Sequence, residues 1–342
     1  MADTTYYVDT DVVGGAADGS SWANAFSRLY DAEALNLDLT TGDTDGVCTI
    51  YCRASAGTAD TTKVAWNGWT MDAGGYVEII GSDDFSGKWD ATKYRLSCTN
   101  GTALSLRDQY IRLDNLQIEV TAANANGQAA IYIYAIVAGG SEFRISNCII
   151  RNHASDTYWG VTLYAQDTDI CNLYVWNCVL QNRIVFDSLN NVCMYINIGG
   201  TAYIYNNTCW GAGATTEYGI RRVAGTVNAY NNVCNNIGGY AFAGTFNAGA
   251  TNISGDATDT GAASDINNTT LTFANTANSD FHLAATDAAA IGAATVDPGS
   301  GLFSDDLDDV VRGAAWDIGA LEYVAAAGGL SIPVAMAAYQ QQ

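Results

Sequence analysis

A repeated segment in the middle of the chain constrains the fold more than any other feature. In each copy, apolar and variable residues alternate up to an asparagine, and cysteine or aliphatic residues then follow. Five copies lie at 111–120, 143–152, 173–182, 202–209 and 227–234, with a second short strand-like segment in each interval. The turn asparagines are 32, 30, 29 and 25 residues apart, and they are Asn115, Asn147, Asn177, Asn206 and Asn231.

This spacing predicts an all-β solenoid. Short strands joined by Gly, Asn and Asp turns describe a coil better than a series of hairpins. One coil cannot bury its apolar face alone, whereas stacked coils build a continuous interior, as in a parallel β-helix. Asparagine suits the repeated corner because it tolerates the left-handed conformation and can pair with the asparagine of the next coil. The alternative is an antiparallel sandwich, but matching strands are joined by no Asn-Gly hairpin turn.

Nine cysteines indicate buried thiols rather than a disulfide scaffold. The number is odd, and the chain of 342 residues is far longer than typical disulfide-rich domains. Cys48 and Cys52 resemble half a zinc site, but the second half is missing, so we expect no metal. Four thiols at one phase of the repeat are predicted to stack as a reduced interior column, and they are Cys148, Cys178, Cys209 and Cys234.

The composition argues against nucleic acid and membranes as partners. Apolar residues make up 49% of the chain, which excludes disorder, and the net charge of −22 disfavours nucleic acid as a partner. No apolar stretch approaches the length of a membrane span, so no membrane is expected either. The first ten residues lack a basic segment followed by an apolar one, and we therefore expect no signal peptide.

The two ends of the chain carry a family resemblance. Residues 6–9 and 18–32 resemble the entry segment of right-handed parallel β-helix proteins of the pectate-lyase-like superfamily. Residues 280–283, 290–292 and 313–323 resemble their closing segment, although Gly292 stands where an acidic residue is usual. The resemblance implies a right-handed parallel β-helix at 45–255. An N-terminal strand and capping helix (1–44, with the helix at 27–39), an irregular C-terminal cap (256–323) and an apolar tail (324–342) would flank it.

Enzymes on this fold cleave polysaccharides in a groove, and whether this chain is one stays open. The resemblance implies Arg or Lys with calcium-binding carboxylates for a lyase, and paired acidic residues for a hydrolase. The basic candidates are Arg151, near His153 and Asp156, and the pair Arg221 and Arg222. The acidic candidates are Asp156, Asp167, Asp169 and Asp187. We interpret Arg151 as the partner of a carboxylate and the aspartates as solvated turn residues.

Acidic stretches and aromatic residues offer two kinds of ligand site. Stretches 43–45, 256–259 and 305–309 match no known calcium loop, so we expect no cofactor, with calcium as the remaining alternative. Six aromatic residues could stack on sugar rings, the alternative being that they pack loops onto the solenoid or lie at a subunit interface. They are Trp66, Trp69, Trp89, Tyr158, Trp159 and Trp210.

Residues 61–69 and 87–95 also resemble the N-terminal half of β-helix proteins encoded by tailed phages. The implied function is a non-enzymatic structural or adhesive component of a bacteriophage particle, as head decoration, fibre or tail protein. It would be made in the host cytoplasm and lie on the virion exterior. Its partners would be other virion proteins, further copies of itself (a trimer by analogy) and a host surface glycan. The alternative is a tailspike-like or secreted polysaccharide lyase or glycoside hydrolase.

The tail after the closing segment is predicted to serve assembly. Residues 330–339 carry no charge, and free exposure of their apolar side chains is unfavourable. A Gly-Gly pair at 328–329 supplies a hinge, and Pro333 favours an extended path. An extended apolar segment suits docking onto a neighbouring subunit. Its predicted contact residues are Leu330, Ile332, Val334, Met336 and Tyr339.

Overall fold

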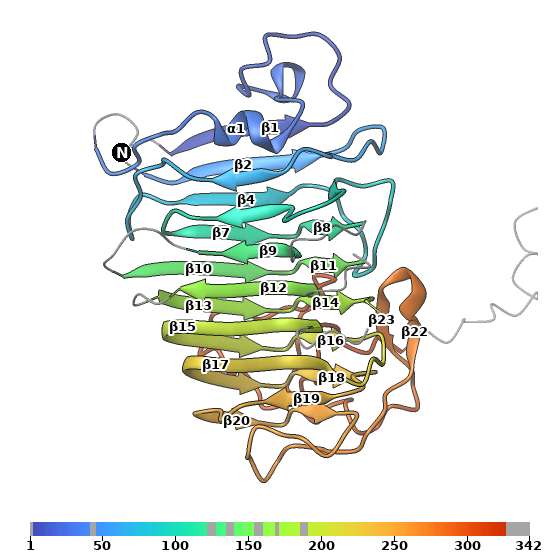
Figure 1. The fold of residues 1–342 in the computed structure, drawn as a ribbon. Helices are drawn as coiled ribbons and strands as arrows, with labels where there is room; N and C mark the ends of the chain where they lie inside the picture. The colour runs from blue at the N-terminus through green and yellow to red at the C-terminus, as the bar shows by residue number, and fades with distance from the viewer. Residues whose placement is uncertain are drawn as a thin grey trace, which may run out of the picture.

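Short parallel strands stack coil upon coil into a β-helix, as the repeat predicts (Figure 1). The computed structural model describes residues 3–41, 46–121, 128–134, 140–153, 160–167, 171–184 and 191–325. Every pairing between strands of the coils is parallel; the one antiparallel strand pair among the described residues is a C-terminal hairpin. No helix in this part of the chain is long and apolar enough to cross a membrane.

Three columns of strands run along the solenoid. Column 1 consists of β3 (Val64–Trp66), β6 (Leu104–Leu106), β9 (Gln128–Ile133), β12 (Gly160–Asp167), the first parts of β15 (Asn191–Tyr205) and β17 (Glu217–Tyr230), and β19 (Tyr240–Ala243). Column 2 consists of β1 (Thr4–Asp9), β2 (Cys48–Arg53), β4 (Val77–Gly81), β7 (Ile111–Asp114), β10 (Ser141–Ser146), β13 (Cys171–Trp176), the second parts of β15 and β17, and β20 (Ala248–Ala250). Column 3 consists of β5 (Leu96–Cys98), β8 (Gln117–Val120), β11 (Ile149–Asn152), β14 (Val179–Asn182), β16 (Thr208–Trp210), β18 (Val233–Asn235) and β21 (Ile253–Ser254).

The repeated asparagines turn the chain from column 2 into column 3. All five adopt the left-handed conformation, with φ between 50° and 59°. The amide of Asn177 donates to Oδ1 of Asn147 (3.2 Å), and that of Asn231 donates to Oδ1 of Asn206 (3.0 Å). The turn continues one coil further at Thr251, whose φ is 54°. The pattern of the sequence therefore predicted both the corner and its backbone conformation.

The four thiols that were predicted to stack occupy two positions in the coil, not one. Cys148 and Cys178 directly follow a corner asparagine, whereas Cys209 and Cys234 pair with each other inside β16 and β18. Because Cys209 pairs with Leu180 in the preceding coil, the prediction of a single column of four is wrong. All nine cysteines are nevertheless buried and free of disulfides.

A second asparagine ladder takes over the position of Cys148 and Cys178 in the later coils. Asn207, Asn232 and Asn252 are fully buried, and each donates its amide to the side chain one coil further on, at 3.0–3.1 Å. The last acceptor in this ladder is Asp265. Each amide also donates to a backbone carbonyl at 2.9 Å, so these buried polar groups are satisfied.

The segment after the last coil returns along the outside of the solenoid. β22 (Phe273–Asn275) and β23 (Asp280–Leu283) form the antiparallel hairpin, which packs against Trp210 and column 3 (Figure 1). Residues 294–325, hereafter the strap, then lie along the asparagine corner, running from Asn231 to Asn177 and back to Asn206. The sequence predicted only a cap for this region, because the contacts of an irregular segment leave no periodic pattern.

The N-terminal helix is shorter than predicted. α1 spans Leu29–Glu33 instead of 27–39, and its fully buried Leu29 and Ala32 belong to the main core. It lies with β1 at the first end of the coil stack (Figure 1). Leu39 is also buried, although it lies beyond the helix.

Candidate functional site

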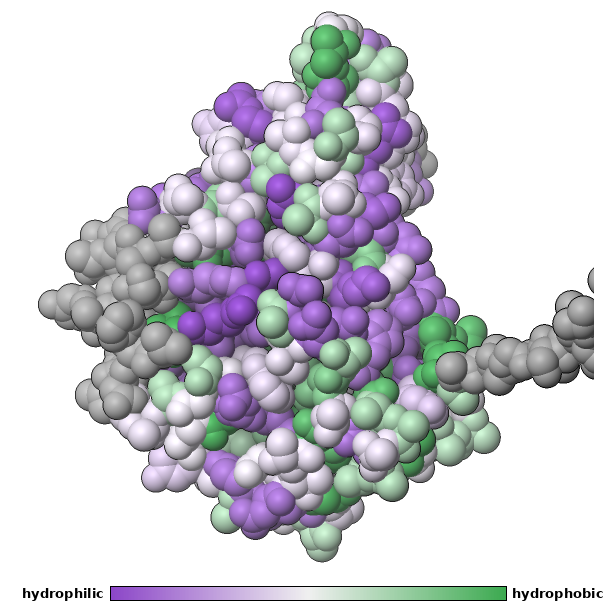
Figure 2. Space-filling model, turned by 90° about the vertical axis from the view of Figure 1, so that its right-hand side faces the viewer, coloured by the Kyte–Doolittle hydropathy of each residue, from purple (hydrophilic) through white to green (hydrophobic). Residues whose placement is uncertain are grey.

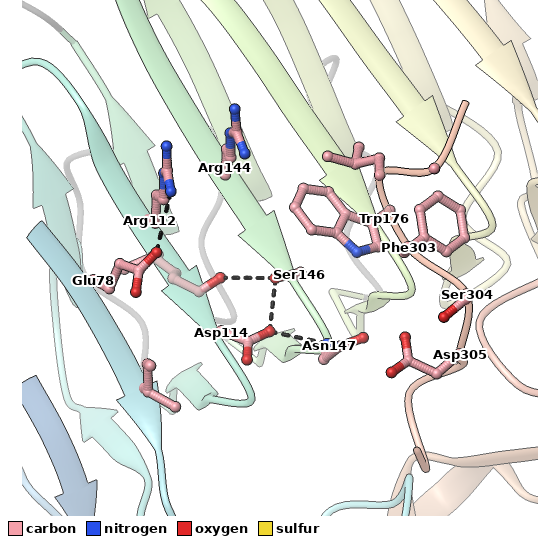
Figure 3. Close-up of a pocket in the computed structure, with 14 residues that line it drawn as sticks. Glu78, Arg112, Asp114, Arg144, Ser146, Asn147, Trp176, Phe303, Ser304 and Asp305 are labelled. Atoms are coloured by element: carbon pink, nitrogen blue, oxygen red, sulfur yellow. Dashed lines mark hydrogen bonds and ion pairs between the residues drawn. The ribbon is translucent and has the colours of Figure 1, made fainter. Parts of the chain in front are cut away.

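An elongated groove lies on the outer face of column 2, with strap residues 298–305 as its second wall. It consists of two adjoining hollows of about 480 Å³ and 440 Å³, which share Arg144, Gly301 and Leu302. Figure 3 shows the larger hollow, between the strands that carry Arg112 and Arg144 and the strap residues Phe303 and Asp305.

Strand alternation explains why these side chains face the groove. Apolar residues such as Leu113 and Val175 point into the core, so their neighbours in the strand point outward. The parallel register then aligns outward residues of successive coils into two rows. One row is Glu78, Arg112, Arg144, Tyr174 and Tyr203. The other is Ile80, Asp114, Ser146, Trp176 and Tyr205.

The two arginines at one end of the groove form ion pairs with glutamates. Arg112 contacts Glu78 at 3.1 Å and Glu142 at 3.6 Å, and Arg144 contacts Glu142 at 2.7 Å. Arg112 also lies over the Tyr76 ring, 3.5 Å from its centroid. These cations are therefore largely neutralised before any ligand arrives.

Aromatic rings line the other end. Tyr174 stacks on Tyr203 with centroids 4.7 Å apart, and Tyr205 follows Tyr203 at 6.2 Å. Trp176 stacks on Phe303 of the strap at 6.1 Å, which joins the two walls. Burial raises the pKa of Tyr205 to about 12 and that of Tyr174 above its ordinary value, so both hydroxyl groups are protonated at neutral pH.

Two carboxyl groups, one from each wall, lie at the lower end of the larger hollow (Figure 3). Asp114 accepts hydrogen bonds from Ser146 Oγ (2.7 Å) and Asn147 Nδ2 (2.9 Å). Burial raises the pKa of Asp114, and the charge of Asp305 raises it further. Two neighbouring carboxyl groups, one of them with a raised pKa, are the kind of arrangement that general acid–base chemistry uses.

Buried polar contacts hold the strap wall in place. Asn177 donates to the backbone carbonyl of Asp305 at 2.8 Å, and Arg312 donates to Oδ1 of Asn177 at 3.0 Å. The side chain of Arg312 is fully buried and forms an ion pair with Glu322. Three corner asparagines, Asn177, Asn206 and Asn231, thus bind the strap, a role that the sequence did not predict.

The aromatic residues predicted to stack on sugars lie elsewhere. Trp66 and Trp69 are buried in the core, Trp89 lies beneath the Arg151 guanidinium (4.2 Å), and Trp210 packs against Phe273 and Phe281. Burial therefore contradicts the prediction of a stacking surface for Trp66 and Trp69. Trp89 and Trp210 are half-buried and pack against their neighbours, as the alternative interpretation had it. Tyr158 and Trp159 lie outside the described residues.

The basic candidates do not form a second groove. Arg151 lies 3.8 Å from Glu119 and 2.8 Å from His153, and burial lowers the pKa of His153 to about 3. Arg222 donates to the carbonyls of Gly225 and Thr245, and Arg221 lies over tyrosine rings of column 1. Asp156, Asp169, Asp187 and the side chain of Asp167 lie outside the part of the chain that the structure describes.

The acidic stretches that are described form hydrogen-bonded turns. Asp256 accepts from the backbone of Thr258, and Asp306 accepts from those of Asp308 and Val310. Among the described residues, no group of three or more His, Cys, Asp or Glu is placed to hold a metal ion. The stretch 43–45 lies outside the described residues, and so do the tail residues Leu330, Ile332, Val334, Met336 and Tyr339.

The surface over column 3 and the β22–β23 hairpin has a different character from the groove. Figure 2 shows a broad hydrophilic band across the middle of this face, with hydrophobic residues in smaller groups above and below it. The Gln181 and Trp210 side chains line a shallow hollow of about 380 Å³ here. It lacks the stacked rings and paired arginines of the groove.

Comparisons with known proteins add little. No family model matches the chain, and no curated protein matches it. Among solved structures, the crystal structure of pectate lyase Pel9A is similar, with 13% identity and a TM-score of 0.38, over 95% of this chain and 97% of that chain. A likeness this weak bears on neither activity nor substrate.

Proposed function

We propose that the protein is a non-enzymatic, glycan-binding structural protein and that column 2 and the strap form its glycan site. The observation that carries the proposal is the continuous groove, in which tyrosine hydroxyls, ion-paired arginines and carboxyl groups lie side by side. Carbohydrate sites combine aromatic side chains with a few polar groups that fix orientation. A flat solenoid face suits a linear chain because it offers similar groups at successive coils.

The proposed setting is the exterior of a bacteriophage particle. The sequence resemblance at 61–69 and 87–95 motivates this setting. Nine buried, unpaired thiols agree with folding in a reducing compartment such as the host cytoplasm. In this setting the other virion proteins and further copies of the chain would bind the tail. Antibody labelling of particles released from the producing cells tests it, with label expected on intact particles.

Binding to a glycan array tests the function itself. We expect the wild-type chain to bind at least one oligosaccharide and the variant Tyr203→Ala, which removes a ring from the groove floor, to lose most of that binding. Tyr51→Ala is the matched control, because Tyr51 lies on the same column near the first coils, stacked on Tyr7. Equal loss in both variants, or no binding by the wild type, would contradict the proposal.

A polysaccharide-cleaving enzyme is the second candidate. Asp114 and Asp305 favour it, because they place a carboxyl group with a raised pKa near a second carboxyl group. Release of reducing ends or of unsaturated products from a polysaccharide panel would reveal cleavage. If cleavage occurs and both Asp114→Asn and Asp305→Asn abolish it, the enzyme assignment replaces the structural one.

A further inference from the structure

Tyr174, in the middle of the groove, cannot receive a sugar on its ring faces. Tyr174 lies on β13, between β10, which carries Arg144, and β15, which carries Tyr203. Tyr203 stacks on one face with an interplanar angle of 10°, and the Arg144 guanidinium lies over the other, 5.4 Å from the centroid. Both faces of Tyr174 are therefore covered by neighbours within the solenoid.

The tyrosines of the groove also carry hydroxyl groups that can bind a ligand. Tyr174, Tyr203 and Tyr205 all line the groove, and none of their hydroxyls has a hydrogen-bond partner within the described residues. A protonated tyrosine hydroxyl both donates and accepts, which matches the hydroxyl groups of a sugar. Coils repeat at about 4.8 Å, close to the length of one sugar residue, so successive tyrosines can meet successive sugars.

The charges in the groove do not favour an anionic ligand. Arg112 and Arg144 are its only cations among the described lining residues, and Glu78 and Glu142 already pair with them. Asp114 and Asp305 add carboxyl groups to the same hollow. The carboxylates of a polyuronate would be repelled by these acidic groups and by the net charge of −22. Among the described lining residues, no unpaired cation offsets this repulsion.

We infer that the groove binds a neutral, hydroxyl-rich linear oligosaccharide that lies across successive coils, rather than a polyuronate. The inference rests on the proposed glycan-binding function and specifies its ligand class. Recognition comes from tyrosine hydroxyls at the edge of the stack. Phenylalanine in place of tyrosine keeps the stacking and removes only the hydroxyl, which makes the inference testable without unfolding the groove.

Calorimetric titration with two sets of hexasaccharides tests it. The neutral set is cellohexaose, maltohexaose, mannohexaose and xylohexaose, and the acidic set is hexagalacturonate and hexaguluronate. We expect a neutral hexamer to bind at least about ten times more tightly than either acidic one at low salt, with little dependence on salt. Tyr174→Phe with Tyr203→Phe should weaken that binding by about 10- to 30-fold, as the loss of two neutral hydrogen bonds implies.

The controls separate the inference from the function on which it rests. Tyr51→Phe, outside the groove, should leave the dissociation constant unchanged. Tighter binding of an acidic hexamer, weakened by salt, would overturn the neutral class while leaving glycan binding intact. Unchanged binding by the double Phe variant would overturn the role of the hydroxyls, and binding of neither set would overturn the function and the inference together.

Discussion

Arg312 and Asn177, which are 135 residues apart in sequence, meet across the interface between strap and solenoid, where the guanidinium donates to Oδ1 of the asparagine at 3.0 Å. The same asparagine holds a left-handed corner, donates to Asn147 and donates to the carbonyl of Asp305. One side chain thus joins neighbouring coils to each other and to the groove wall.

Replacement of Asn177 by leucine should lower the free energy of unfolding by roughly 2–4 kcal/mol, through the strained corner and the lost hydrogen bonds. Asn177→Gly tolerates the positive φ and should lose only the part due to hydrogen bonds. Urea denaturation followed by circular dichroism measures both, with Asn172→Ala, an exposed position in β13 just before the corner, as the control. Equal losses for leucine and glycine would show that the corner conformation contributes nothing.

The contribution of the buried Arg312–Glu322 ion pair to the free energy of unfolding should require both residues. Arg312→Met leaves the Glu322 carboxylate buried without its cation, and we expect a loss of about 3–5 kcal/mol. Adding Glu322→Gln removes the unpaired charge and should recover at least about 1 kcal/mol of that loss. The double-mutant cycle in urea checks this, and a double variant less stable than Arg312→Met would contradict it.

Glu217 should make stability depend on pH. Burial raises the pKa of this carboxyl group to about 7, against hydrogen bonds from the backbone of Ala212 and Gly213. Between about pH 4.5 and 7 the folded chain keeps a proton that the unfolded chain has lost, so stability should fall as pH rises through this window and level off above it. Denaturation midpoints across this range should show the fall.

The variant Glu217→Gln isolates this contribution from those of the other acidic groups. It should flatten the slope between pH 4.5 and 7 while leaving the slope below pH 4.5 unchanged. A wild type and a variant with parallel pH profiles would assign the dependence to other residues.

The thiols should be unreactive in the folded protein. All nine are buried, and burial raises the pKa values of Cys48 and Cys98 to about 12, so almost no thiolate exists at pH 8. Ellman's reagent should react with none of them rapidly in the native state and with nine after unfolding without reductant. A smaller count after unfolding would reveal disulfides and argue against folding in a reducing compartment.

Removal of residues 328–342 tests the predicted assembly tail. Within the described residues, the last hydrogen bond of the strap is the one that the Tyr323 backbone donates to Asp317. We therefore expect the truncated chain to unfold at the same urea concentration as the full chain. We expect the truncated chain to self-associate more weakly in analytical ultracentrifugation, or to be present in smaller amounts on phage particles. Normal assembly of the truncated chain would contradict a role for Leu330, Ile332, Val334, Met336 and Tyr339.

The solenoid could be predicted from the sequence because its information is periodic. Asn115 to Asn231 mark each corner, and alternation assigns Val175 and Ile204 to the core. The strap could not be predicted in the same way, because its bonds to Asn206 and Asn231 come largely from backbone carbonyls, which every residue carries.

The groove could not be predicted from the sequence for a related reason. Tyr174, Trp176, Tyr203 and Tyr205 stand at the outward positions of two predicted repeats, so the signal was present in the alternation. These positions form a groove only because the parallel register aligns them into rows and the strap covers one side, and alternation alone predicts neither. Tryptophans in irregular loops carry no such register: Trp69 is buried in the core and Trp89 packs beneath Arg151.

The path of the strap changes how the molecule comes apart. Each coil of a bare solenoid touches only its neighbours, so the last coils can fray one at a time. Here the strap is bound at Asn231, Asn206 and Asn177 and reaches Gly87 through Leu321. The C-terminal coils therefore cannot unfold one at a time until those bonds break. We expect the coils from Asn177 to Asn231 to unfold together, as one cooperative unit.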